Sequence, residues 1–146
     1  MNISMNISNG GTVPDPDHGG RNPSSLPLKV ILLVDDRDEL RVTMKWFLTN
    51  FGYEVDSARN AEEALVLFDP KIHNLVITDN SMPGMTGVEM SHIIKLRSPA
   101  TPVVMFSGSP PADRSCLDFV IRKPAHLMEL KEAVDKLMAD RAPGPA

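Results

Sequence analysis

Short apolar runs alternate along this chain with longer stretches in which apolar residues recur every three or four positions. The runs cover Val30–Val34, Leu75–Thr78, Pro102–Phe106 and Phe119–Ile121, and each is too short for a helix. Tyr53–Ser57 instead alternates apolar and polar residues, which is typical of a strand at the edge of a sheet. Strands that alternate with helices predict a parallel sheet covered on both faces. We therefore expect an α/β fold with a doubly wound, five-stranded parallel sheet.

Four stretches with helical spacing lie between and after these runs. Each has one apolar stripe that predicts a helix packed against the sheet. The stripes consist of Leu40, Met44, Phe47, Leu48 and Phe51; of Ala61, Ala64, Leu65 and Phe68; of Met90, Ile93 and Ile94; and of Leu127, Leu130, Val134 and Leu137. Asn60, with Glu63 three residues later, predicts a capping box at the start of the second helix.

The length of 146 residues fits one domain with a real core. Residues 1–27 are rich in Asn, Gly, Ser, Asp and Pro and have no hydrophobic periodicity, which predicts a disordered tail. The folded domain is expected over residues 28–139. Residues 140–146 are expected to be a flexible tail, because the prolines of RAPGPA cannot continue a helix.

Composition excludes several classes of function. A net charge of −4 argues against a nucleic-acid partner. The single cysteine, Cys116, excludes an intrachain disulfide. No apolar run reaches membrane-spanning length, and the first residues lack the basic and apolar regions of a secretory signal. We expect a cytoplasmic protein without a membrane partner.

Polar side chains that can carry chemistry follow the predicted strands. Asp35 and Asp36 follow the first strand, Asp79 the third, Ser107 the fourth and Lys123 the fifth. Ligands of doubly wound sheets bind at the carboxyl ends of the strands, so these side chains converge if their strands are neighbours. Clustered carboxylates repel one another unless a hard cation such as Mg²⁺ lies between them. The sequence therefore predicts a magnesium site that can accept a phosphoryl group.

Phosphoryl transfer requires an in-line nucleophile and positive charge on the phosphoryl oxygens. Asp79 is the expected nucleophile, because it precedes a turn that keeps its carboxylate exposed. Asp36 and Asp79 are expected to hold the metal, with Asp35 acting through water. Lys123 is expected to neutralise one phosphoryl oxygen, and the Ser107 hydroxyl to donate to another.

The segments VILLVDD, LVITDNSMPGMTG, PVVMFSG and VIRKP resemble, in order and spacing, the CheY-like receiver domains of two-component response regulators. The resemblance covers about residues 28 to 139 and implies a flavodoxin-like sheet with strand order 2-1-3-4-5. It also implies the site residues: Asp79 as phosphoacceptor, Asp35 and Asp36 as the acidic pair, Ser107 as the hydroxyl, Lys123 as the lysine, and the Ser81 backbone carbonyl as a further Mg²⁺ ligand.

The expected function is that of a single-domain phosphoacceptor in a two-component system or phosphorelay. A sensor histidine kinase or a histidine phosphotransfer protein would donate the phosphoryl group to Asp79. The changed surface would then be presented to an unidentified downstream protein. Catalysis would be limited to self-catalysed phosphotransfer and slow self-dephosphorylation, so the protein is not expected to be an enzyme in the ordinary sense.

Two alternatives stay open. The first is a phosphorylation-independent, pseudo-receiver interaction module on the same fold. The second is a phosphatase with an aspartyl nucleophile, like haloacid-dehalogenase-like enzymes, which is disfavoured because those enzymes place a second Asp where this chain has Ser81. Taken singly, each site residue also has an ordinary structural explanation as a helix cap, a turn residue or a solvated lysine. Only their joint placement favours a site.

Two departures from the receiver pattern affect the expected output. Ser107 and Lys123 are only sixteen positions apart, and Pro110-Pro111 removes part of that interval from any helix. We therefore predict that the fourth crossover helix is short, distorted or absent. Receivers usually place an aromatic switch residue where this chain has Val120. Ser107, Phe119 and Val120 are the candidate switch residues, although Phe119 would need a bulge to point the same way as the usual aromatic residue.

Overall fold

The computed structural model describes residues 28–139, which form a parallel sheet with helices on both faces. The strands are β2 (Val30–Val34), β3 (Glu54–Ala58), β4 (Leu75–Thr78), β5 (Val103–Ser107) and β6 (Phe119–Arg122), and the helices are α1 (Asp38–Asn50), α2 (Ala61–Leu67), α3 (Gly87–Arg97) and α4 (Leu127–Ala139). The tails expected over residues 1–27 and 140–146 lie outside the described residues.

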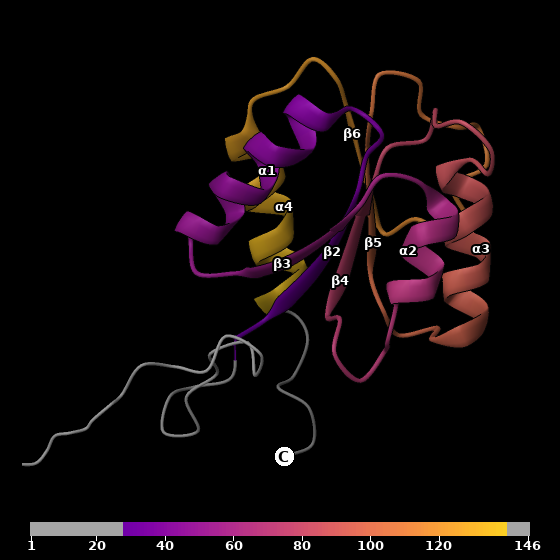
Figure 1. The fold of residues 1–146 in the computed structure, drawn as a ribbon, viewed down its shortest axis with the longest axis horizontal. Coiled ribbons are helices and arrows are strands. Elements are labelled where there is room, and N and C mark those ends of the chain that lie inside the picture. Colours follow the sequence, from indigo (N-terminus) through magenta and orange to yellow (C-terminus); the bar gives the residue numbers. More distant parts are fainter. Residues whose placement is uncertain (1–27, 140–146) are drawn as a thin grey trace, which may run out of the picture.

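The sheet order is β3-β2-β4-β5-β6, and every neighbouring pair is parallel. Counted along the described strands, this is the order 2-1-3-4-5, so the expected fold is confirmed. β3 lies at one edge, as its alternating pattern predicted. Helices α1 and α4 cover one face of the sheet, and α2 and α3 cover the other (Figure 1).

Two apolar cores lie on either side of the sheet, and β2 contributes to both. Ile31 and Leu33 pack in the core beneath α1 and α4, whereas Leu32 and Val34 pack in the core beneath α2 and α3. Successive side chains of a strand point to opposite faces, so a strand covered on both sides must be apolar throughout. This is why the central strands appear in the sequence as continuous apolar runs.

The predicted stripe of α1 extends one residue too far. Met44 and Leu48 are buried, but Phe51 is 47% exposed. Phe51 follows the last helical residue, and the chain then turns at Gly52, whose φ is +97°. Its ring packs edge-on against Phe47, with a centroid distance of 5.0 Å. Phe51 therefore covers the end of the helix instead of entering the core.

The capping box predicted for α2 is half formed. Asn60 Oδ1 accepts a hydrogen bond from Glu63 N at 2.7 Å, but the Glu63 carboxylate accepts from Arg59 N and not from Asn60. A complete capping box instead begins α3, where Thr86 and Glu89 cap each other's backbone. This box fixes the start of the helix that follows the β4 loop.

The connection between β5 and β6 contains no helix in residues 108–118. The prediction of a shortened or absent helix is confirmed, and Pro110-Pro111 supplies the physical reason. Asp118 anchors the far end of the segment, because its Oδ2 accepts from Val103 N at 2.8 Å and from Lys95 Nζ at 2.7 Å. Hydrogen bonds to the sheet and to α3 therefore hold a segment that has no helix of its own.

Candidate functional site

Backbone hydrogen bonds fix the first residue after each of the strands β2, β4 and β6, at the carboxyl ends of the sheet strands. Asp35 N donates to Ala58 O at 3.2 Å, and Asp79 N donates to Val34 O at 3.1 Å. Lys123 N donates to Ser107 O at 2.9 Å. These bonds continue the parallel ladders, so the residues that carry the site start from rigid positions.

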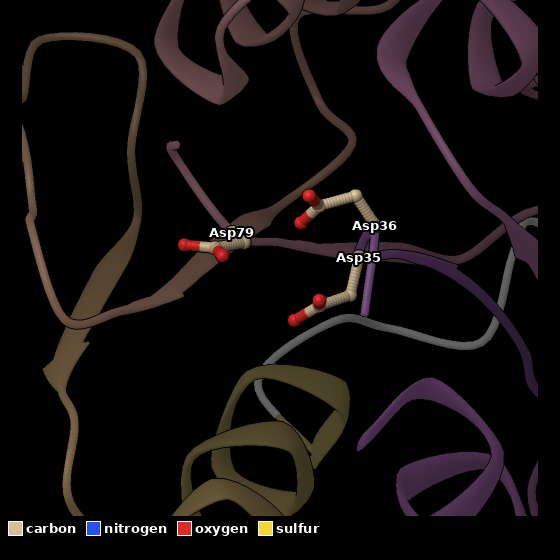
Figure 2. A group of neighbouring side chains, drawn as sticks. All are labelled: Asp35, Asp36 and Asp79. Atoms are coloured by element: carbon tan, nitrogen blue, oxygen red, sulfur yellow. The ribbon is translucent and has the colours of Figure 1, made fainter. Parts of the chain in front are cut away.

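The carboxylates of Asp35, Asp36 and Asp79 converge at this edge, as Figure 2 shows. One oxygen from each lies within 4.8 Å of the others, and within residues 28–139 this is the one such group of potential metal ligands. Asp35 is 1% exposed, Asp79 is 6% exposed and Asp36 is partly exposed. Three carboxylates this close require positive charge among them.

Lys123 supplies part of that charge. Its Nζ lies 3.3 Å from Asp35 Oδ2 and 3.9 Å from Asp79 Oδ2. The ammonium group also lies 5.1 Å from the centre of the Phe106 ring. The lysine therefore bridges two buried carboxylates that come from different strands.

Arg37 supplies a second cation, which the sequence analysis missed. Its Nε lies 3.6 Å from Asp35 Oδ1, and its Nη2 lies 3.7 Å from Asp79 Oδ2. Its backbone N donates to Asp35 Oδ1 at 2.9 Å. The side chain is 55% exposed, so it covers the acidic group from the solvent side. The only sequence signal was its position directly after the acidic pair.

A pocket of about 240 Å³ opens beside the acidic group. Ser107 lines it and is fully buried, and its Oγ accepts a hydrogen bond from Ser109 N at 3.1 Å. The oxygen is the acceptor in that contact, so the Ser107 hydroxyl keeps its proton available to donate to another group. The lining residues are Asp36, Arg37, Asp79, Ser81, Ser107, Gly108 and Ser109. The structure thus places Ser81 and Ser107 in the same pocket as Asp36 and Asp79.

The turn after Asp79 is closely packed. Asp79 Oδ1 accepts from Asn80 N at 2.7 Å, and the Asn80 side chain accepts from Val88 N at 3.0 Å. A Cβ added to Gly87 would lie 2.0 Å from the Asp79 carbonyl oxygen. Glycine at position 87 is therefore required for α3 to begin this close to the acidic residue.

The candidate switch residues other than Ser107 lie away from the pocket. β6 pairs with β5 without interruption, and Val120 stands opposite Met105. No bulge interrupts the four pairs from Phe119 to Arg122, so nothing re-aims Phe119. Phe119 is 42% exposed on this edge strand. The structure does not bring Phe119 and Val120 together with the carboxylates.

The sequence of residues 31–135 matches the family described as response regulator receiver domain. The chain belongs to this family. Receiver domains are signalling modules, and the relatives of this one include both sensor proteins and regulators. Sensor protein EvgS of Escherichia coli is 30% identical over 122 residues, which cover 79% of this chain and 10% of EvgS. Response regulator protein PilR of Pseudomonas aeruginosa is 30% identical over 119 residues, which cover 77% of this chain and 26% of PilR. The receiver thus spans only a small part of each of these relatives.

Solved receiver structures agree with the fold. Response regulator protein TrrA of Thermotoga maritima, solved in complex with Mg²⁺ and BeF, superimposes with a TM-score of 0.71 at 34% identity, covering 75% of this chain and 99% of TrrA. The non-phosphorylated HemR receiver domain of Leptospira biflexa gives a TM-score of 0.73 at 26% identity, covering 79% of this chain and 98% of that domain. Among the helices of residues 28–139, none is long and apolar enough to cross a membrane.

Proposed function

We propose that this receiver accepts a phosphoryl group on Asp79 from the phosphohistidine of a sensor kinase or a histidine phosphotransfer protein. The observation that carries the proposal is the convergence of three carboxylates with Lys123, next to a pocket that Ser107 lines. Membership of the receiver family and the range of its relatives support the same conclusion.

The residues at the site suit Mg²⁺. The donors are hard oxygens, and Asp36 and Asp79 line the pocket where an ion could enter. Asp35 already accepts from Arg37 N with one oxygen and from Lys123 Nζ with the other, which favours an indirect role through water. Asp36, Asp79 and the Ser81 carbonyl would therefore hold the ion, which would neutralise charge on the phosphoryl oxygens.

In the transfer step, the side chains of this site act directly on the phosphoryl group of the donor. A carboxylate oxygen of Asp79 attacks phosphorus, the bond from phosphorus to the donor imidazole nitrogen breaks, and the imidazole leaves with the electron pair. Lys123 pairs with one phosphoryl oxygen and the Ser107 hydroxyl donates to another. Arg37 lies on the open side of the pocket and can move to the incoming group, because half of its side chain is exposed.

A second candidate function is a phosphorylation-independent interaction module. The observation that favours it is the altered surface between β5 and β6, where residues 108–118 have no helix and Val120 takes the place of the usual aromatic residue. The complete set of acidic and basic site residues favours phosphorylation instead. If Asp79 is phosphorylated, the altered surface between β5 and β6 would contact the downstream protein.

Intact mass spectrometry after incubation with acetyl phosphate distinguishes the two candidates. We expect a Mg²⁺-dependent gain of one phosphoryl group that Asp79→Asn abolishes. Asp69→Asn is the matched control. Asp69 precedes β4, so it lies at the amino-terminal ends of the strands, whereas the acidic group lies at their carboxyl ends. No gain in the unmodified protein with Mg²⁺ present would contradict the proposal and favour the phosphorylation-independent module.

A further inference from the structure

Cys116, His92 and Asp113 form a hydrogen-bonded chain on the surface between α3 and the segment of residues 108–118. Cys116 Sγ lies 3.1 Å from His92 Nδ1. The other ring nitrogen, Nε2, lies 2.9 Å from Asp113 Oδ2. A nucleophile, a base and a group that orients the base, all within hydrogen-bond reach, are the arrangement of an activated nucleophile.

Asp113 determines which nitrogen of His92 carries the proton. Hydrogen bonds from the Ser115 hydroxyl at 2.7 Å and from Ser115 N at 3.0 Å, together with His92, lower the pKa of Asp113 to about 2. The carboxylate is therefore ionised at neutral pH and can only accept a hydrogen bond. In the neutral imidazole the proton lies on Nε2, which leaves Nδ1 to accept the thiol proton of Cys116.

The thiol is open to small molecules. Cys116 is partly exposed, and both His92 and Asp113 are exposed. The whole chain contains no other cysteine, so an intramolecular disulfide cannot consume the thiol. None of the three residues lines the phosphoacceptor pocket. We propose that Cys116 is a modification site that forms a mixed disulfide with a low-molecular-weight disulfide, with His92 as its base and Asp113 as a positioning residue.

The reaction balances as a thiol–disulfide exchange. His92 Nδ1 takes the thiol proton, and the Cys116 thiolate attacks one sulfur of the small disulfide. A bond forms between Cys116 Sγ and that sulfur while the original S–S bond breaks. The departing thiolate takes the proton from the imidazolium and leaves as a thiol. One disulfide is consumed and one is formed, so no further oxidant is needed.

The position of the thiol gives the modification a structural consequence. The Cys116–His92 contact joins the segment without a helix to α3, and a bound thiol group would replace it. The other end of the same segment reaches the phosphoacceptor turn, where Asn80 Nδ2 donates to Ser109 O at 3.2 Å. A modified Cys116 would therefore alter a surface that is also attached to the site.

Reaction with glutathione disulfide, followed by intact mass, tests the proposal. We expect the folded protein to gain one glutathionyl group, removed by dithiothreitol, about tenfold faster than the chain unfolded in urea. His92→Gln keeps a hydrogen-bond acceptor but cannot take up a proton, so it should be as slow as His92→Ala. His126→Ala removes an exposed histidine just before α4 and should react at the unmodified rate.

The Asp113 variants separate positioning from packing. Asp113→Ala should slow the reaction, whereas Asp113→Asn retains an acceptor for the Nε2 proton and should restore most of the rate. A folded-state rate no higher than that of the unfolded chain, or a His92→Gln protein that reacts at the full rate, would overturn the proposal. Acetyl phosphate labelling of the same variants checks folding and tests a separate site, so failure of one proposal is distinguishable from failure of the other.

Discussion

The guanidinium of Arg37 lies 3.7 Å from the Oδ2 of Asp79, on the side of the acidic group that faces solvent. Lys123 approaches the same oxygen to 3.9 Å. Two side-chain cations therefore share the carboxylate that we propose as phosphoacceptor. Because Arg37 is the more exposed of the two, it is the one that an incoming cation or phosphoryl group can displace.

Arg37→Ala is expected to strengthen Mg²⁺ binding by about two- to fivefold, since the exposed guanidinium competes with the ion for the same oxygens. Isothermal titration calorimetry measures the effect. Arg59→Ala is the control, because Arg59 forms an exposed pair with Glu63 on a different helix. Equal affinities for the Arg37→Ala and Arg59→Ala proteins would show that Arg37 does not compete for the site.

Lys123→Ala is expected to lower the free energy of unfolding by about 1–3 kcal/mol without Mg²⁺, because Asp35 then stays buried without its ammonium partner. Saturating Mg²⁺ should recover part of that loss while acetyl phosphate labelling stays impaired. Urea unfolding with and without Mg²⁺ measures both stabilities. Lys136→Ala removes an exposed lysine of α4 and should change neither property. A loss of stability that Mg²⁺ leaves unchanged would contradict the claim that Lys123 and Mg²⁺ neutralise the same carboxylates.

Gly87→Ala is expected to destabilise the fold by about 1–3 kcal/mol, because the new Cβ would overlap the Asp79 carbonyl oxygen. Gly108→Ala is the matched control, since its Cβ would have no neighbour within 4 Å. Urea unfolding should show a change of less than about 0.5 kcal/mol for that control. Equal stabilities for the two variants would mean that α3 can move away from the β4 turn without cost.

Asp135 on α4 should make the free energy of unfolding depend on pH in the acidic range. Burial raises its pKa, but hydrogen bonds from Lys131 and Tyr53 outweigh that effect and hold it below its ordinary value of 3.8. A carboxyl whose pKa is lower in the folded state contributes stability above about pH 4 and loses it as pH falls through the folded pKa.

The penalty of Asp135→Asn should therefore be about 0.5–1 kcal/mol at pH 7 and shrink at about pH 3. Urea unfolding of both proteins at the two pH values gives the comparison. Glu132→Gln, on the same helix and exposed, should show no such pH-dependent difference. A penalty that stays constant between the two pH values would show that the ionised carboxylate of Asp135 does not contribute this stability.

The order of strands and helices was predictable, because apolar runs and stretches with helical spacing alternate along the chain. Val30–Val34 and Leu75–Thr78 were located to the residue, because strands buried on both faces must be apolar. The missing helix after β5 followed from Pro110-Pro111 and a short interval. Asp79 and Lys123 were expected to lie close together because ligands of doubly wound sheets bind at the carboxyl ends of the strands, and Lys123 Nζ lies 3.9 Å from Asp79 Oδ2.

Features that depend on contacts between distant residues were not predictable. Cys116 and His92 are 24 residues apart, and only the packing of residues 108–118 on α3 brings them together. Arg37 was missed because an exposed charge at a helix start is usually solvated. Phe51 was assigned to the core because the periodic pattern does not show where a helix ends.

The central claim is that Asp79 carries the phosphoryl group, and reductive trapping tests it most directly. After incubation with acetyl phosphate and Mg²⁺, borohydride reduces an aspartyl phosphate to homoserine, and peptide mass spectrometry locates the altered residue. We predict homoserine at position 79, formed only when Mg²⁺ is present. Trapping at another position, or none in a protein that has gained a phosphoryl group, would contradict the account.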